Sequence, residues 1–382
     1  MEDVTLDPQR QERAKEYAKI SRRFMLVDLI IGILYVLAWL GLGWSLDLKD
    51  YLLQWTSNDW LLVAGFGIVF GAVISLLTLP LSYYTGFVLP HRFEQSNQTL
   101  KGWITDQIKG ILVSGPIGLL LLEVIYAILR GNPITWWLWA AGFLLVFNVL
   151  LTNLAPILLF PIFYKFIPLE DEHADLVERL LTLAERANTK VNGVYKFDMS
   201  RRTKAANAAL TGIGNSRRII LGDTLIDEFT SDEIETILAH ELAHHVNKDI
   251  PLGIMISSVT TLVGLYLASL GLNWGVNFFG FESAADIAAL PLFGLVLGAF
   301  SFVTMPLGNA WSRSRERMAD TYALETTKQS SAFISAFTRL ANQNLSDVDP
   351  EPWVEWLLHS HPAISKRIAM AREFEITQNP VR

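Results

Sequence analysis

The chain has 382 residues, of which 51% are hydrophobic and only 18% are charged, and its mean hydropathy is +0.31. Soluble domains carry about 25% charged residues, so this composition excludes an ordinary soluble globule and indicates a membrane protein with a polar domain. The net charge of −7, without a basic stripe, argues against nucleic acid as a partner, and the absence of cysteine excludes disulfides and thiolate chemistry.

Six windows of the sequence are apolar enough and long enough to cross a bilayer, which takes about 20 residues. They lie at 25–44, 60–82, 108–129, 135–163, 251–272 and 285–307. Residues 1–24 are too charged and too long for the n-region of a signal peptide, so we expect the first window to remain as a span. The sequence therefore predicts six transmembrane helices in contact with the lipid bilayer.

Basic residues that flank these windows predict the orientation. The flanks 1–24 and 308–317 are rich in Lys and Arg, and the loop 83–107 holds further basic residues, whereas 273–284 holds none. Since positive flanks stay on the cytoplasmic side, we expect both termini and the active site there. The membrane is then the cell membrane in a prokaryote or the endoplasmic reticulum membrane in a eukaryote.

The alternation of apolar and polar stretches divides the chain into four regions. We expect an N-terminal membrane domain with four spans at 1–165, a soluble subdomain at 166–250, two further spans at 251–307 and a cytoplasmic helical region at 308–382.

The soluble subdomain shows an α+β pattern. Apolar residues at helical spacing predict a helix over 169–189 that ends at Asn188. Three short strand-like runs follow at 191–199, 205–212 and 217–223, separated by turn residues such as Gly214 and Asn215. A second helix is expected over 233–247, with Thr230, Ser231 or Asp232 as its N-cap.

The stretch ILAHELAHHVNKDIP at 237–251 holds three of the seven histidines. His240 and His244 lie four apart, so on a helix their imidazoles leave one face, and Glu241 stands beside them. This H-E-x-x-H spacing supplies two nitrogen ligands for Zn²⁺ and a general base. The alternative is a helix whose histidines are exposed or packed in the core.

A catalytic zinc site needs a third protein ligand, and SRSRERMAD at 312–320 offers two carboxylates four apart, Glu316 and Asp320. One of them could bind the metal while the other supports a ligating imidazole by a hydrogen bond. The alternative is an ordinary basic flank behind a span.

These motifs resemble the integral-membrane zinc metalloendopeptidases, namely the type I CAAX prenyl endopeptidases and the HtpX-like heat-shock proteases. The resemblance implies that Glu316 is the third zinc ligand and that Asp320 belongs to the catalytic residues as a proton donor. Further matching stretches favour the CAAX branch; they lie at 87–110, 160–173, 207–212, 217–227 and 359–368. The CAAX enzymes are expected to have seven spans around a chamber, and this sequence predicts six.

We therefore expect a mainly α-helical multi-pass membrane protein with an embedded zincin-like α+β metallopeptidase domain and one Zn²⁺ per chain. The expected reaction is hydrolysis of peptide bonds in membrane-associated or lipidated, CAAX-like prenylated substrates. Glu241 would serve as the general base. The resemblance implies that His361 or Arg367 supports the oxyanion, and Asn207 could bind the substrate backbone at a strand edge.

Two other functions remain open at this stage. Within the enzyme class, an HtpX-like protease for quality control of membrane proteins competes with the processing of prenylated substrates. A transporter or an inactive membrane scaffold would account for six spans and for the mid-span Glu123, but not for H-E-x-x-H.

Overall fold

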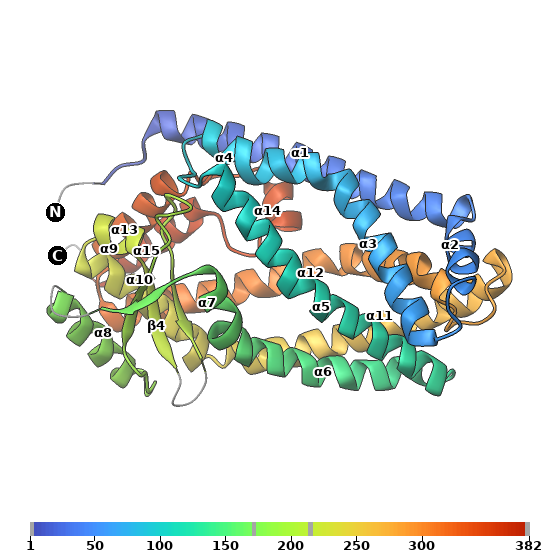
Figure 1. The fold of residues 1–382 in the computed structure, drawn as a ribbon. Helices are drawn as coiled ribbons and strands as arrows, with labels where there is room; N and C mark the ends of the chain where they lie inside the picture. The colour runs from blue at the N-terminus through green and yellow to red at the C-terminus, as the bar shows by residue number, and fades with distance from the viewer. Residues whose placement is uncertain (1–3, 170–172, 213–216, 379–382) are drawn as a thin grey trace.

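The computed structural model describes residues 4–169, 173–212 and 217–378, which form a long helical part and a shorter mixed α/β part (Figure 1). The predicted turn residues Gly214 and Asn215 lie outside the described residues, as does the segment 170–172 within the predicted first helix of the soluble subdomain.

Six helices in the described part of the chain are long and apolar enough to cross a membrane, which agrees with the six predicted windows. They extend beyond these windows because their polar flanks stay helical. Their bounds are Pro8–Gly41 (α1), Asp59–Arg92 (α3 at Asp59–Tyr83, η1 at Tyr84–Val88 and α4 at Leu89–Arg92), Leu100–Gly131 (α5), Trp136–Phe163 (α6 at Trp136–Leu154, η2 at Ala155–Leu159 and α7 at Phe160–Phe163), Asp249–Phe279 (α11) and Ile287–Thr327 (η5 at Ile287–Ala289 and α12 at Leu290–Thr327).

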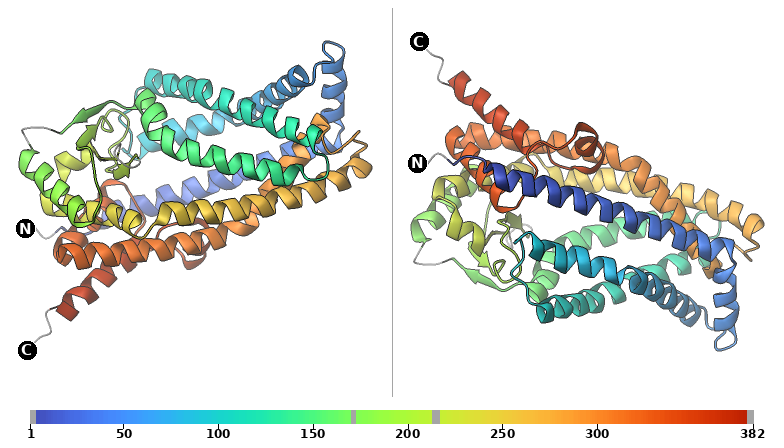
Figure 2. Two further views of the ribbon diagram at one scale, coloured as in Figure 1. Left: turned by 90° about the horizontal axis from the view of Figure 1, so that it is seen from below. Right: turned by 90° about the horizontal axis from the view of Figure 1, so that it is seen from above.

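The six long helices close into a ring. Each packs against two others, in the order α1, α3, α5, α6, α11, α12 and back to α1. Figure 2 shows the same arrangement from two sides, with α1 beside α12 and with α6 beside α11. Six helices are therefore enough to form a closed bundle in this chain.

A short helix closes the far end of the ring. This helix, α2 (Trp44–Leu53), packs against η5. The buried Lys49 on α2 donates to Asp286 over 2.8 Å and also lies 2.8 Å from Glu282. Because an unpaired buried ammonium would be costly, this ion pair fixes α2 to the connection between α11 and α12.

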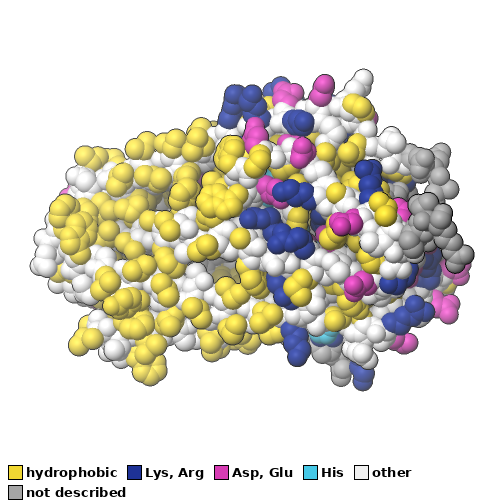
Figure 3. All heavy atoms as spheres, turned by 180° about the vertical axis from the view of Figure 1, so that it is seen from behind, with side chains coloured by type: hydrophobic (Ala, Val, Ile, Leu, Met, Phe, Trp, Pro, Cys, Tyr) yellow, Lys and Arg dark blue, Asp and Glu magenta, His cyan; other side chains and the backbone are white. Residues whose placement is uncertain are grey.

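The side chains on the outer surface change from apolar to charged along the long axis of the molecule. Figure 3 shows apolar side chains over the helical part and charged side chains of both signs over the mixed part. Side chains such as Leu76 and Leu307 on the helical part are highly exposed, as expected for positions that face lipid.

The mixed part is built on a four-stranded sheet with strand order β1-β2-β4-β3, in which only β2 and β4 are parallel. The strands are β1 (Phe166–Pro168), β2 (Val194–Phe197), β3 (Ala208–Thr211) and β4 (Arg218–Gly222). The three predicted strands are present. The strand β1 was not predicted, because a strand of three residues is too short to show an alternation of apolar and polar side chains. The strand β3 lies at an edge of the sheet, next to α10.

Helices surround the sheet and share its apolar core. They are α8 (Ala174–Arg186), α9 (Asp223–Glu228), α10 (Ser231–Val246), α13 (Ser330–Gln343) and α15 (Ile364–Gln378), whereas α14 (Pro352–Leu358) packs against α12. Helix α12 belongs to both parts, since its first half lies in the ring and its second half packs against α10. The two predicted helices of the soluble subdomain correspond to α8 and α10.

Candidate active site

Helix α10 places the first two histidines. The Thr230 side chain accepts from the Glu233 backbone N–H, and the Glu233 carboxylate accepts from the Thr230 N–H, so that the helix begins at a capping box. Of the three residues expected as the cap, Thr230 is therefore the one used. Ten residues later His240 is buried, and His244, one turn further on, is partly exposed.

The two imidazoles converge on Glu316 of α12. His240 Nε2 lies 3.2 Å from Glu316 Oε2, and His244 Nε2 lies 3.5 Å from Glu316 Oε1. Possible ligand atoms of these three residues all lie within 4.8 Å of one another. The structure thus brings together the three residues that the sequence analysis named as metal ligands.

The donor set fits a zinc ion. Two imidazole nitrogens and one carboxylate oxygen form a common protein ligand set for catalytic zinc. The buried Oε2 atom of Glu316 has no hydrogen-bond partner among the described residues. Because a buried charged oxygen is expensive to leave unpartnered, a cation at this point would satisfy it.

The Nδ1 atom of each imidazole lies next to a carboxylate. His240 Nδ1 lies 2.9 Å from Asp320 Oδ1, and His244 Nδ1 lies 2.8 Å from Asp249 Oδ2. A carboxylate on Nδ1 fixes the ring orientation and leaves Nε2 free as a ligand. Asp320 therefore lies behind His240, where it can perform the supporting role considered for it.

Asp249 was missed by the sequence analysis. It is the first residue of α11, and its carboxylate also pairs with Arg315 of α12. The sequence did contain a hint, because Asp249 follows His244 by five residues, across the break between two helices. Only the turn at Asn247 and Lys248 brings it back to the ring nitrogen.

Glu241 stands on α10 between the two histidines in sequence and is partly buried. Burial raises the pKa of its carboxyl, while His240 and His244 act in the opposite direction. A carboxylate with a raised pKa is a better proton acceptor near neutral pH, which suits the predicted general base.

His361 joins this group from the C-terminal region. Its Nε2 lies 3.4 Å from Glu316 Oε1, and its side chain is 60% exposed. The segment that carries it is fixed by Arg313 of α12, whose Nη1 donates to the carbonyl oxygens of Glu355 (2.9 Å) and His359 (2.6 Å). The partly exposed His361 is thus held beside the imidazoles of His240 and His244.

Arg367 is buried and already paired. Its Nε donates to Asp320 Oδ2 over 2.8 Å, and its guanidinium lies 4.0 Å from the centre of the Phe337 ring. Its Nη2 is 3.9 Å from Glu316 Oε2. This arrangement suits a residue that orients Asp320 better than one that contacts a substrate directly.

Asn207 is exposed and immediately precedes the edge strand β3. Its backbone carbonyl accepts from Gly222 N–H over 2.9 Å. None of the hydrogen bonds or ion pairs around Glu316 in the described part of the chain involves Asn207. Its predicted contact with a substrate backbone therefore depends on a peptide lying along β3.

A cavity of about 420 Å³ opens next to the candidate metal site. His244, Asp249 and Glu316 line one side of it. The remaining lining residues come from helices of the ring, namely Asn148, Thr152, Ile250, Gly253, Ile254, Ser257, Trp311, Ser312 and Arg315. The site therefore faces a space that extends towards the membrane part.

Comparisons with known proteins agree with this architecture. The family model "Peptidase family M48" matches residues 170–375, and the model "CAAX prenyl protease N-terminal, five membrane helices" matches residues 2–165. "Uncharacterized metalloprotease YhfN" of Bacillus subtilis is 31% identical over 95% of this chain and 85% of its own length. "CAAX prenyl protease 1" of Saccharomyces cerevisiae is also 31% identical, over 77% of this chain and 68% of its own length. The crystal structure of S. mikatae Ste24p superposes with a TM-score of 0.87 at 25% identity, covering 97% of this chain and 90% of that one.

Proposed function

Since the chain belongs to peptidase family M48, we propose that it holds one Zn²⁺ between His240, His244 and Glu316 and cuts lipidated, CAAX-like prenylated peptides. The family makes the chain a metalloendopeptidase, and its six apolar helices make it a multi-pass membrane protein. The single observation that carries the zinc assignment is the convergence of both Nε2 atoms on the buried Glu316 carboxylate, whose Oε2 atom has no hydrogen-bond partner among the described residues.

The proposed reaction assigns a separate role to each residue of the site. When bound, zinc would polarise the scissile carbonyl and make a water easier to deprotonate. Glu241 would take the proton of that water and pass it to the leaving amine. His361 would donate to the developing oxyanion. Asp320 and Asp249 keep the two imidazoles in the orientation that binding requires.

Substrate binding would combine a strand edge with the cavity. An extended peptide can add to the free edge of β3, beside Asn207, by backbone hydrogen bonds. The cavity that reaches from His244 to α6 and α11 would then receive a group attached to the peptide. A prenyl group fits this role because the surrounding helices lie in the apolar part of the molecule, and a curated relative is named a CAAX prenyl protease.

We further propose that both termini and the site face the cytoplasm. The three basic flanks 1–24, 83–107 and 308–317 lie at the end of the molecule that holds the sheet, where both termini also lie (Figure 1). At the opposite end, Lys49 and Arg130 are each paired with acidic residues.

One experiment tests the reaction and the substrate class together. Purified protein is given quenched peptides that carry a CAAX-like end with and without a prenyl group, before and after chelation and re-addition of Zn²⁺. We expect cleavage of the prenylated peptide, loss with chelator and recovery with zinc. The variant Glu241→Gln should lose at least about a hundredfold in kcat with bound zinc unchanged.

The matched control is Glu228→Gln, which changes an exposed carboxylate at the end of α9 and should leave the rate unchanged. Equal cleavage of both peptides would refute prenyl recognition and favour quality control of membrane proteins. A parent-like rate in Glu241→Gln would show that another group is the base.

A further inference from the structure

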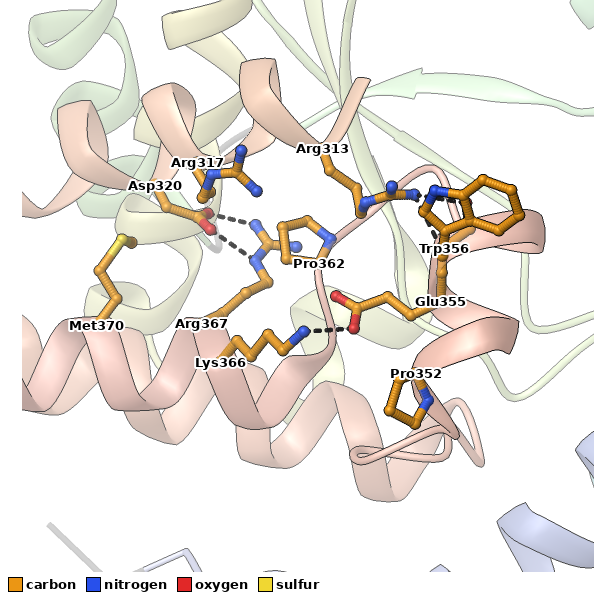
Figure 4. Close-up of a pocket in the computed structure, with 10 residues that line it drawn as sticks. All are labelled: Arg313, Arg317, Asp320, Pro352, Glu355, Trp356, Pro362, Lys366, Arg367 and Met370. Atoms are coloured by element: carbon orange, nitrogen blue, oxygen red, sulfur yellow. Dashed lines mark hydrogen bonds and ion pairs between the residues drawn. The ribbon is translucent and has the colours of Figure 1, made fainter. Parts of the chain in front are cut away.

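A second cavity lies between α12, α14 and α15 and has a volume of about 430 Å³. Figure 4 shows its lining, in which four basic side chains surround the space: Arg313, Arg317, Lys366 and Arg367. The acidic side chains in the lining are Asp320 and Glu355. The cavity therefore carries an excess of positive charge.

The excess lies on Arg313 and Arg317, because the two carboxylates are paired with the other two basic residues. Asp320 accepts from Arg367, and Glu355 accepts from Lys366 and from the Ala363 N–H over 3.1 Å. The hydrogen bonds and ion pairs of the described residues include none made by the Arg317 guanidinium, which is exposed at the cavity (Figure 4). Arg317 is thus a free cation at the edge of a basic cavity.

This cavity is separate from the catalytic group. The ion pair of Asp320 and Arg367 forms its wall, and His240 lies behind that pair, with Nδ1 2.9 Å from Asp320 Oδ1. The cavity that contains His244 and Glu316 is a different one. A ligand of the basic cavity is therefore not the peptide bond under attack.

The cavity lies where the apolar surface meets the charged end. Trp353 and Trp356 of α14 are both 57% exposed, and Trp356 lines the cavity. Exposed tryptophans of this kind are typical of the membrane interface. On the face drawn in Figure 3, basic side chains gather at the border between the two kinds of surface.

One face of α12 leads from the membrane part to Arg317. Val303, Ala310 and Arg317 are exposed and follow one another at intervals of seven residues, which differ by only about 20° around a helix axis. Val303 lies about 21 Å along the axis from Arg317 at the usual rise per residue. An acyl chain beside Val303 would place its headgroup at the cavity.

We propose that this basic cavity binds the phosphate of an anionic membrane lipid, with Arg317 as the cation that meets it. Arginine binds phosphate oxygens with paired N–H donors, and basic pockets on the cytoplasmic side of membrane proteins suit acidic headgroups. The acyl chains lie along the exposed face of α12, and Trp356 lies at the level of the interface. The assignment needs only a membrane-embedded chain and does not depend on the substrate of the peptidase.

The test measures lipid binding to the full-length protein by native mass spectrometry, during titration with phosphatidylglycerol, with phosphatidylcholine and with inorganic phosphate. We expect one phosphatidylglycerol to bind in preference to phosphatidylcholine. The variant Arg317→Glu should weaken that binding about thirtyfold, because it removes an attraction of roughly 1 kcal/mol and adds a repulsion of similar size, about 2 kcal/mol together. Arg317→Lys should stay within about threefold of the parent, because it retains the charge.

The control is Arg372→Glu on α15, which makes the same charge change at an exposed residue that does not line the cavity. It should bind the lipid as the parent does. Equal losses in both Glu variants would show general surface attraction and overturn the site. Displacement of the lipid by inorganic phosphate at millimolar concentration would assign the cavity to a soluble phosphate instead, and unchanged binding in Arg317→Glu would refute the proposal.

Discussion

At the scale of single residues, the orientation of the two histidines is set by residues outside the proposed ligand set. Each histidine presents Nε2 to Glu316 because a carboxylate occupies its Nδ1, Asp320 for His240 and Asp249 for His244. A free imidazole can rotate and change tautomer, so these outer contacts decide which nitrogen is available.

A pair of variants separates binding of the metal from orientation of its ligands. Glu316→Gln removes the only carboxylate of the proposed ligand set, and we expect the purified variant to lose most of its zinc. Asp249→Asn keeps all three ligands but weakens the hydrogen bond to His244 Nδ1. We therefore expect the zinc affinity to fall about 10- to 100-fold. Elemental analysis gives the zinc content, and competition with a chelator gives the affinity.

Asp227→Asn, an exposed change on α9, is the control and should bind zinc like the parent. Full zinc occupancy in Glu316→Gln would mean that a different residue is the third ligand.

At the scale of elements, α12 links the membrane part to the catalytic chemistry. It is one continuous helix over Leu290–Thr327, whereas the apolar window predicted for the sixth span ends at 307. The same helix carries Glu316, Asp320 and Arg313, at positions that face α10 and the segment before His361. A rigid helix sets the distances between these groups better than a loop would.

Arg313 is the contact through which α12 positions His361. Arg313→Gln removes the donors to the carbonyls of Glu355 and His359, and we expect kcat to fall about tenfold or more while the zinc content stays unchanged. If Arg313 acts through His361, then adding Arg313→Gln to His361→Ala should lower kcat little further, since coupled residues are not additive. Steady-state kinetics of the three variants give this comparison.

Fully additive losses in the double variant would show that Arg313 acts independently of His361. A fall in zinc content would show a general structural role for Arg313.

At the scale of the whole molecule, the ring of six helices and the sheet-bearing end form one body with both termini at the same end (Figures 1 and 2). An even number of spans requires both termini on one side of the membrane. The connection between α2 and α3 then lies on the opposite side.

Single cysteines test this topology directly, because the chain has none of its own. Ser57 lies between α2 and α3 and Thr377 lies near the end of α15, and both are exposed. In sealed vesicles of cytoplasm-inside orientation, an impermeant maleimide should label Ser57→Cys and should label Thr377→Cys only after lysis. The reverse pattern would invert the proposed orientation.

Much of the fold was predictable because its signals are local. Long apolar windows must be helical in lipid, since no water is there to satisfy the backbone, and the count of six agrees with the structure. The spacing of His240 and His244 fixed a shared helix face in the same way. The resemblance of HELAH and SRSRERMAD to known membrane peptidases then indicated the family to which the chain belongs.

What the sequence determined by itself was therefore the set of membrane helices, the helix face that carries two histidines and the family. Only the tertiary structure decided that Asp249 holds His244, that Arg313 fixes the segment of His361, and that six helices close into a ring. The physical reason is that periodicity and spacing constrain neighbours within one helix, whereas contacts between residues such as Arg313 and His359 depend on how separate helices pack.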